Sequence, residues 1–476
     1  MTCRLVALSA AVVTAAALAA APADRPPRGG YPAPKTLGPV ETYGANIRRA
    51  MSLMATSTPL KRNTVRVLFY GQSISAQEWT TTVAERLRRR YPMADLVIEN
   101  RAILGFTAEY LVHTAEADLY PFYPDLVIFH DYGQEADFEA IVRRLRERTT
   151  ADVLIATDHV APLIGERMDE EADLAKVKPS LFGPWRNRIF LPRVAKQYGA
   201  ELADVRALWK RYLADYKLSP SALLYDDLHL NAHGNYLMGE VIDAHLRHRP
   251  DLPDDDRTDR VATFVVGTDV EWKDGKLVLP FDGNRVDLVC QETADGPAAA
   301  VRIDGRKPSE FPELYVPTRA LLTAPRGLVP PLLKIGAEKM RAAEDWRMVV
   351  TDVSPDKGRF KFRVVGSVTG EDGAGESGKP FVSKSGRVAF EPVDFNVKNA
   401  VERSPNPTAD RYEIRWSVAA LHADRFAVPA VKNPFGETVV TAAQGLTNGR
   451  HTLELTGGPD TPLAAVRVYR PPLAAK

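Results

Sequence analysis

A serine stands at a sharp turn that follows an apolar run. Residues 69–75 read FYGQSIS, and Gly71 lets the backbone turn tightly because it has no Cβ. In an open α/β sheet, reactive groups gather beyond the carboxyl ends of the strands. The hydroxyl of Ser73 would face that crevice, with backbone N–H groups nearby to stabilise negative charge. Ser73 is therefore a candidate nucleophile; the alternative is an ordinary helix cap, for which serine is a preferred residue.

An aspartate and a histidine lie three positions apart in a second polar stretch, YDDLHLNAHGN over residues 225–235. In the loop expected there, this spacing lets the carboxylate of Asp226 bond one imidazole nitrogen of His229. The other nitrogen is then free to take a proton from a hydroxyl, which is the role of a general base. Asp227 and His233 are close competitors. The alternative is a polar loop with two solvated histidines.

Two further positions are candidates for contacts with a substrate. Gly105, in the stretch ENRAILGFTAEYL, can bring its N–H close to a ligand, or it is a plain turn glycine. His159 ends the fourth expected strand and would also face the crevice, as a substrate-binding group or as a buried histidine.

Carboxylates and imidazoles near the same strand ends raise the question of a metal. His130, Asp131, Asp158 and His159 are residue types that suit Zn or Mn. None of them lies at an HxxxH-type spacing, so we predict no metal site and no cofactor.

Alternating strands and helices must position these side chains. Apolar, β-rich runs occupy residues 64–71, 94–100, 124–133 and 149–160, and amphipathic stretches of helical spacing separate them. Buried strands alternating with such helices predict a parallel sheet covered on both faces.

The pattern changes at RPDLPDDDRTDR, residues 249–260. Beyond it, two-residue alternation with tight-turn pairs predicts a mainly-β sandwich or jelly-roll-like region. We expect a short helix within residues 330–346 and an exposed loop at the glycine-rich residues 369–379. Trp272, Trp346 and Trp416 could form a stacking surface for sugars, or belong to the core.

The bulk properties bound the partners and the location. The chain has 476 residues, a formal net charge of +1 and 45% apolar residues, so it predicts several domains and offers no reason to expect nucleic acid as a partner. Its start has the pattern of a secretory signal without a stop-transfer segment, which predicts export to the periplasm or outside the cell and no integral membrane span. Only Cys290 would remain after cleavage. The expected segments are a signal peptide at 1–21, a Pro/Gly-rich leader at 22–45, the α/β domain at 46–250, a linker at 251–260 and the mainly-β domain at 261–476.

Three stretches in order resemble the blocks of the SGNH (GDSL-like) hydrolase family. GQSI at residues 71–74 resembles the nucleophile block, with Gln72 where Asp is usual, and NRAILG at residues 100–105 resembles the second block, with Ala102 in place of a glycine. DDLH at residues 226–229 fits the final Asp-x-x-His block. The resemblance covers about 200 residues and implies a flavodoxin-like three-layer α/β/α fold and serine ester hydrolysis.

One block departs from the family pattern. Members carry Gly-x-Asn-Asp after the third strand, where the Asn side chain donates to the oxyanion, but this chain has FHDYGQEAD, with Gly133 about where the Asn is expected. Loss of one oxyanion donor typically lowers the rate by ~10²–10³. The Gly133 N–H, the Gln134 amide, or a side chain from His130 or Tyr132 could replace it.

We therefore expect an exported serine esterase that deacetylates carbohydrate and acts on an acylated small molecule or polysaccharide. The alternatives are a non-catalytic glycan-binding or cell-surface protein with a degenerate hydrolase domain, and a metal-dependent hydrolase. The expected site residues are Ser73, His229 and Asp226 as catalytic residues, the N–H groups of Ser73, Gly105 and Gly133 as oxyanion donors, and His159 and Gln134 as substrate-binding residues.

Overall fold

The computed structural model describes residues 30–162, 182–253, 259–291, 296–323, 329–404, 411–431, 433 and 436–474. The predicted signal peptide, residues 1–21, lies outside the described residues, as do parts of the predicted leader and linker.

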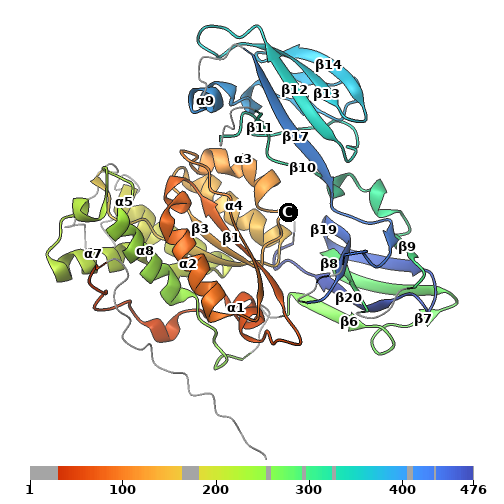
Figure 1. The fold of residues 1–476 in the computed structure, drawn as a ribbon, viewed down its shortest axis with the longest axis horizontal. Helices are drawn as coiled ribbons and strands as arrows, with labels where there is room; N and C mark the ends of the chain where they lie inside the picture. Colours follow the sequence, from red (N-terminus) through yellow and green to blue (C-terminus); the bar gives the residue numbers. More distant parts are fainter. Residues whose placement is uncertain are drawn as a thin grey trace, which may run out of the picture. The chain divides into compact units, whose positions relative to one another are not determined.

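Five parallel strands form the sheet of the first domain, in the order β2-β1-β3-β4-β5. Figure 1 shows two of them, β1 and β3. This is the order of a flavodoxin-like fold, in which the strand order reverses between β1 and β3. The strands are β1 Thr64–Gly71, β2 Asp95–Asn100, β3 Leu126–His130, β4 Asp152–Ala156 and β5 Glu201–Ala203.

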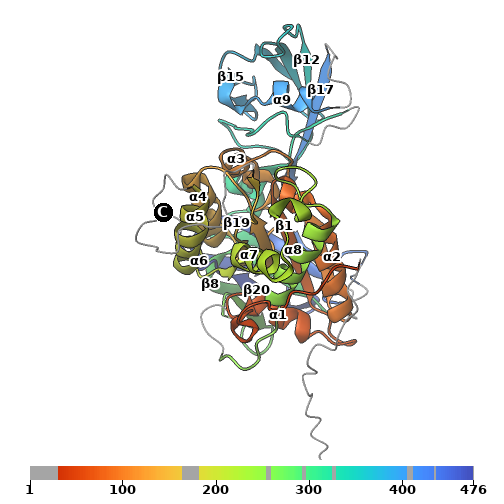
Figure 2. The same ribbon diagram turned by 90° about the vertical axis from the view of Figure 1, so that its left-hand side faces the viewer.

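Helices cover both faces of this sheet. The helices of this domain are α1 Arg48–Ala55, α2 Glu78–Arg90, α3 Ala108–Asp118, α4 Glu135–Arg148, α5 Phe182–Trp185, α6 Leu191–Tyr198, α7 Val205–Tyr216 and α8 Ala232–His245. Figure 2 shows α4 and α6 on one side of the sheet and α2 and α8 on the other.

Alternate residues along the strands feed two hydrophobic clusters. On β1, Val67 and Phe69 pack with α1, α2, α7 and α8, while Leu68 and Tyr70 pack with α3, α4 and α6. Because successive strand side chains point to opposite faces, both faces of the sheet are buried. The predicted three-layer α/β/α class is confirmed.

The mainly-β character predicted beyond residue 261 is also confirmed, and the region contains two larger antiparallel sheets. One has the order β18-β9-β19-β8-β20-β6, with β7 paired to β8, and has a hydrophobic cluster of its own. Its strands are β6 Val261–Val265, β7 Trp272–Lys273, β8 Lys276–Cys290, β9 Ala299–Ile303, β18 Arg425–Phe426, β19 Val439–Thr456 and β20 Leu463–Tyr469.

The second β sheet comes from a segment inserted in the chain between β9 and β18. Its order is β10-β17-β12-β13-β14, with β11 paired to β17. Its strands are β10 Tyr315–Pro317, β11 Leu321–Leu322, β12 Asp345–Thr351, β13 Lys361–Gly366, β14 Gly370–Glu376 and β17 Tyr412–Ala420. The short strands β15 Phe381–Val382 and β16 Ala389–Phe390 and the helix α9 Val397–Glu402 complete the insertion.

Three expectations about the β region are corrected or decided. The glycine-rich stretch expected as a loop forms β14, because a ladder with β13 satisfies its backbone groups. Residues 330–346 form no helix. Trp346 and Trp416 are core residues, 2% and 3% exposed and stacked on each other, so these two cannot form a surface for sugars.

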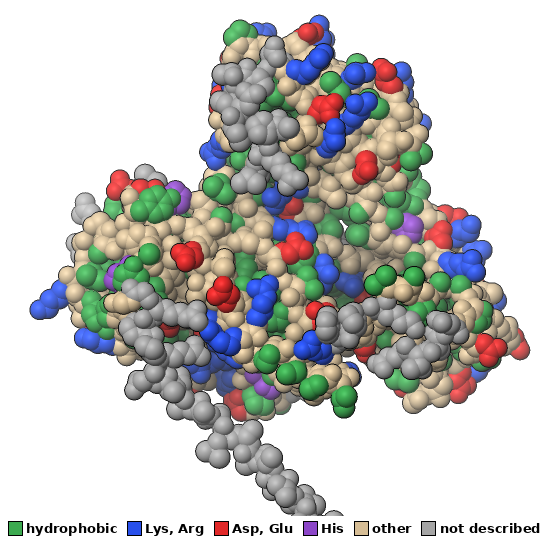
Figure 3. Space-filling model, in the orientation of Figure 1, with side chains coloured by type: hydrophobic (Ala, Val, Ile, Leu, Met, Phe, Trp, Pro, Cys, Tyr) green, Lys and Arg blue, Asp and Glu red, His purple; other side chains and the backbone are tan. Residues whose placement is uncertain are grey.

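The surface and the helices bear on the expected partners. On the face seen in Figure 3, Lys and Arg side chains lie among Asp and Glu side chains, as the net charge of +1 indicates. Among the residues that the structure describes, no helix is both long and apolar enough to cross a membrane.

One carboxylate ties the amino-terminal edge of the parallel sheet together. Asp125, just before β3, pairs with Arg49 of α1 at 2.8 Å and accepts from the backbone N–H of Arg66 at 2.9 Å. Its own carbonyl accepts from the backbone N–H of Asp152 at 2.8 Å. This cluster lies at the edge opposite to the carboxyl ends of the strands.

We expect Asp125→Asn to lower the free energy of unfolding by about 3 kcal/mol, because it removes the carboxylate that is paired with the buried Arg49. Urea denaturation measures this. The control is Asp215→Asn. The partner of Asp215, Arg211, is 63% exposed, so this substitution should lower the free energy of unfolding by less than about 1 kcal/mol. Equal effects of the two substitutions would contradict the anchoring role of Asp125.

Candidate active site

The turn that carries Ser73 is pressed against the end of a neighbouring strand. Gly71 is opposite His130 in the β1–β3 register and has a φ of 146°. A Cβ on Gly71 would lie 1.9 Å from the carbonyl oxygen of His130, so only glycine fits there. A 3₁₀ turn, Ser73–Ala76, follows, and the Ser75 hydroxyl donates to the same carbonyl at 3.0 Å.

The loop before α8 folds around the carboxylate of Asp226. Its Oδ1 accepts from the backbone N–H groups of Leu228 at 2.7 Å and His229 at 2.6 Å. Its Oδ2 lies 2.8 Å from His229 Nδ1. This contact fixes the His229 tautomer with the proton on Nδ1, so that Nε2 is left as an acceptor.

His229 Nε2 lies 2.9 Å from Ser73 Oγ. Both members of this pair are reachable from solvent, since the His229 side chain is 27% exposed and Ser73 is half-buried. Ser73, His229 and Asp226 thus stand in one hydrogen-bonded series, which is the arrangement of a serine nucleophile, its base and the group that orients the base.

Two side chains hold the loop of His229 against the turn of Ser73. The amide of Gln77, just before α2, contacts both the carbonyl and the N–H of Leu230, at 2.9 and 3.2 Å. His159, beyond β4, contacts the carbonyl of Leu228 through Nε2 at 2.7 Å. The geometry of the series therefore depends on two strand ends as well as on its own loop.

The charge state of Asp226 suits this arrangement. Desolvation by itself would raise the pKa of Asp226. The hydrogen bonds from the backbone and the imidazole of His229 outweigh it and hold this pKa below its ordinary value. The carboxylate is therefore ionised at neutral pH and can stabilise an imidazolium.

His233 and Asp227, the close competitors of His229 and Asp226 in the sequence, are not part of this series. His233 Nε2 is 2.7 Å from the hydroxyl of Tyr212, within the helical layer. Asp227 is exposed, and it is Asp226 that contacts the imidazole.

The loop of Gly105 runs beside the turn of Ser73. The N–H of Ile103 donates to the carbonyl of Gly71 at 3.0 Å, and Gly105 has a φ of 71°. Arg403, at the end of α9 in the β insertion, donates to the carbonyl of Leu104 at 2.9 Å, and a Cβ on Gly105 would lie 2.2 Å from its Nη1. The β insertion thus reaches the loop in which an oxyanion donor is expected.

Gly133 and Gln134 lie against the start of α3. Gly133 has a φ of 104°, and a Cβ there would be 2.4 Å from the carboxylate of Glu109. Gln134 is exposed, and its backbone N–H donates to that carboxylate at 3.3 Å. The roles predicted for Gly133 as an oxyanion donor and for Gln134 as a substrate-binding residue stay predictions.

The N–H of Ser73, also expected to stabilise an oxyanion, already has an acceptor. The side-chain oxygen Oε1 of Gln72 lies 2.7 Å from the Ser73 nitrogen and 2.6 Å from its Oγ. The Gln72 side chain is buried, 4% exposed, in the turn itself.

Two histidines near the strand ends are fully buried. Burial lowers the pKa of His130 to about 3 and of His159 to about 4, so both are neutral. The Nδ1 atom of His159 is 3.5 Å from the hydroxyl of Tyr132. With Leu228 on its other nitrogen, His159 has the contacts of a positioning residue, and its predicted binding of substrate stays a prediction.

Two of the residues considered for a metal, Asp158 and Asp131, contact a buried guanidinium. Arg186 lies 3.4 Å from the carboxylate of Asp158 and donates to the carbonyl of Asp131. In the described part of the chain, no group of three or more His, Cys, Asp or Glu side chains is arranged to hold an ion.

One residue that the sequence did not single out stands next to His229. Tyr225 is 66% exposed, and its ring is stacked on the imidazole with centroids 5.5 Å apart and planes 12° apart. The only signal in the sequence is its place directly before Asp226.

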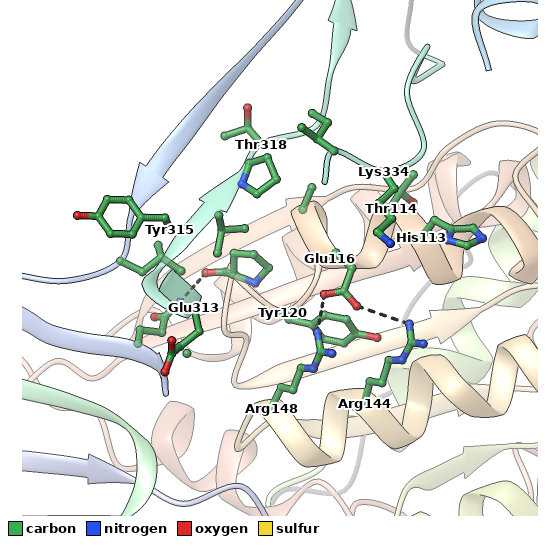
Figure 4. A pocket seen from close by; sticks show the side chains of 18 of the residues that line it. His113, Thr114, Glu116, Tyr120, Arg144, Arg148, Glu313, Tyr315, Thr318 and Lys334 are labelled. Atoms are coloured by element: carbon green, nitrogen blue, oxygen red, sulfur yellow. Dashed lines mark hydrogen bonds and ion pairs between the residues drawn. The ribbon is translucent and has the colours of Figure 1, made fainter. Parts of the chain in front are cut away.

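A cavity of about 670 Å³ lies away from this site, between α3, α4 and the β region, and Figure 4 shows its lining. Ser73, His229 and Asp226 are not among its lining residues. Glu116 in its wall pairs with both Arg144 and Arg148 of α4, so one carboxylate is shared by two guanidinium groups.

No family model and no curated protein sequence matches the chain. Among solved structures, a two-domain esterase (CEX) active on acetylated mannans is 13% identical, with 90% of this chain and 96% of that chain covered and a TM-score of 0.34. A putative GDSL-like lipase from Parabacteroides merdae is 17% identical over 39% of this chain and 98% of that chain, with a TM-score of 0.32. The acetylxylan esterase Axe2 from Geobacillus stearothermophilus is 16% identical over 40% of this chain and 96% of that chain, with a TM-score of 0.32. At these TM-scores the assignment of the fold rests on the chain's own sheet order. The chain is similar to these two esterases and this GDSL-like lipase, and its own sequence blocks resemble those of the GDSL-like (SGNH) hydrolase family.

Proposed function

We propose that this protein is a serine esterase that hydrolyses carboxylic esters. The observation that carries the proposal is the series from Ser73 Oγ through His229 to Asp226, with contacts of 2.9 and 2.8 Å. The series stands beyond the carboxyl ends of β1 and β4, where ligands bind in open α/β sheets.

In the acylation step, Ser73 Oγ attacks the carbonyl carbon of the ester while His229 Nε2 takes the hydroxyl proton. Asp226 holds the proton on Nδ1 and stabilises the imidazolium. When the tetrahedral intermediate collapses, His229 gives its proton to the leaving alcohol and an acyl group remains on Ser73.

In the second step, a water molecule attacks the acyl-serine. His229 takes a proton from this water and returns it to Ser73 Oγ as the acid leaves. The backbone N–H groups of Ser73 and Gly105 would hold the negative oxygen in both steps. The third donor is proposed at the Gly133 N–H or the Gln134 amide.

We propose further that the substrate is an acetylated carbohydrate. Tyr225 supports this part, because an exposed ring next to the base offers a flat apolar face with a polar tip, which suits the mixed surface of a sugar. Export of the chain stays a prediction from its first 21 residues, as does the boundary between the domains at residues 251–260.

Substitution in the triad tests the reaction. We expect Ser73→Ala to abolish the hydrolysis of p-nitrophenyl acetate and Asp226→Asn to lower kcat by about 10⁴, since the imidazole loses the group that fixes its tautomer. Asp227→Asn is the matched control and should keep its activity, because Asp227 does not contact the imidazole.

Equal rates in the parent chain and in Ser73→Ala would leave Ser73 as an ordinary first residue of the 3₁₀ turn, with no role as a nucleophile. Binding of an acetylated glycan by both proteins, with no turnover of any ester, would favour the glycan-binding alternative instead.

Substitution of Tyr225 tests the substrate class. We expect Tyr225→Ala to raise KM for an acetylated oligosaccharide about fivefold, the worth of one aromatic contact, and Tyr225→Phe to change it little. Steady-state kinetics on the oligosaccharide and on p-nitrophenyl acetate measure this. An equal loss with both substrates would mean that Tyr225 only holds His229.

A further inference from the structure

The side chain of Gln72 contacts both the backbone N–H and the hydroxyl of Ser73, the two groups that the proposed reaction needs. Its Oε1 accepts from the Ser73 backbone N–H at 2.7 Å and lies 2.6 Å from the Ser73 hydroxyl oxygen. The orientation of the amide follows from the backbone, because a peptide N–H can only donate and therefore faces the oxygen of the amide. The acceptor atom of Gln72 is thus directed at Ser73.

The first consequence concerns the hydroxyl proton. The Ser73 hydroxyl carries one hydrogen, and two acceptors stand within reach of it, Gln72 Oε1 at 2.6 Å and His229 Nε2 at 2.9 Å. A hydroxyl that donates to the amide is not donating to the imidazole. Gln72 therefore competes with the general base for the proton whose removal activates the nucleophile.

The second consequence concerns the oxyanion. The N–H of Ser73 can stabilise a substrate carbonyl oxygen only if that oxygen stands within about 2.7–3.1 Å of it. Gln72 Oε1 already stands at that distance. An ester must displace the amide oxygen before this donor becomes available.

The local backbone keeps the Gln72 side chain in this place. Gly71 is locked against the carbonyl of His130, so the chain leaves β1 in one direction. Gln72 follows with extended dihedrals, φ −106° and ψ −151°, and caps the turn that begins at Ser73. Capping of the turn affects stability, whereas competition for Ser73 affects the rate of the reaction. An experiment that measures both can separate the two roles of Gln72.

We propose that Gln72 masks the nucleophile in the free protein and is displaced by the acyl carbonyl of a bound ester. The proposal rests on the proposed function, with Ser73 as the nucleophile. It makes turnover depend on substrate contacts elsewhere at the site, because binding must break two contacts of Gln72 before the reaction begins. Small esters without such contacts should therefore be hydrolysed more slowly than their chemical reactivity alone would predict.

Two variants of nearly the same size separate the possible roles of Gln72. Gln72→Met keeps the volume but has neither the amide oxygen nor the amide donor. Gln72→Glu keeps an acceptor, and a stronger one, but loses the donor. The readouts are kcat/KM for p-nitrophenyl acetate and the rate of labelling by a fluorophosphonate, in which Ser73 Oγ bonds to phosphorus, fluoride leaves and His229 takes the proton.

If Gln72 masks Ser73, Gln72→Met raises both rates at least about fivefold, as expected when a neutral hydrogen bond no longer has to be broken. Gln72→Glu lowers both rates, and the loss grows as the pH rises and the new carboxylate ionises. Thermal unfolding of both variants reports the capping role on its own.

Three outcomes would overturn the masking role. Rates that fall by ~10²–10³ in both variants would mean that the amide is an oxyanion donor. Rates equal to those of the parent chain, with a lower unfolding temperature, would leave Gln72 only as a cap. Labelling of the parent chain at the same rate as Gln72→Met would reject the masking role but not the proposed function. The absence of labelling and of hydrolysis in all of the proteins would reject the proposed function itself.

Discussion

The close approach of Gly71 to the carbonyl of His130 is the constraint on which the site depends. The space between them admits no Cβ, so the end of β1 and the end of β3 meet at one point, and the chain must leave β1 as a tight turn. Ser73 stands at the start of that turn, and the hydroxyl of Ser75 binds the same carbonyl. The position of Ser73, the proposed nucleophile, is thus set by the packing of two buried strands.

The rest of the series is brought to Ser73 by a loop from more than 150 residues further along the chain. That loop is short, and its own hydrogen bonds to Asp226 orient His229 without help from outside. Its distance from Ser73, however, is set by the contacts of Leu230 with Gln77 and of Leu228 with His159. Because His159 is buried and neutral, it holds the loop without placing a charge beside the imidazole.

The β region contacts this edge of the α/β domain through arginine side chains, and Arg319 donates to the carbonyl of Arg101 at 2.8 Å. Arg403 binds the carbonyl of Leu104 and lies against Gly105, where a larger residue would collide with the guanidinium. The loop expected to hold an oxyanion donor is therefore supported from the insertion that carries β10 to β17. Ser73, His229 and Asp226 all lie in the α/β domain, and part of the support for the neighbouring loop comes from the β region.

By itself the sequence determined the α/β class, the mainly-β region and the few candidate residues, because apolar periodicity and the short Asp226–His229 spacing are local properties. Only the tertiary structure decided that Asp226 and not Asp227 contacts His229, that Trp346 and Trp416 are buried, and that the glycine-rich residues 370–376 form a strand. It also decided that the amide of Gln72 faces Ser73. These features depend on pairing and packing between segments, or on a side-chain torsion, and neither leaves a periodic signal along the chain.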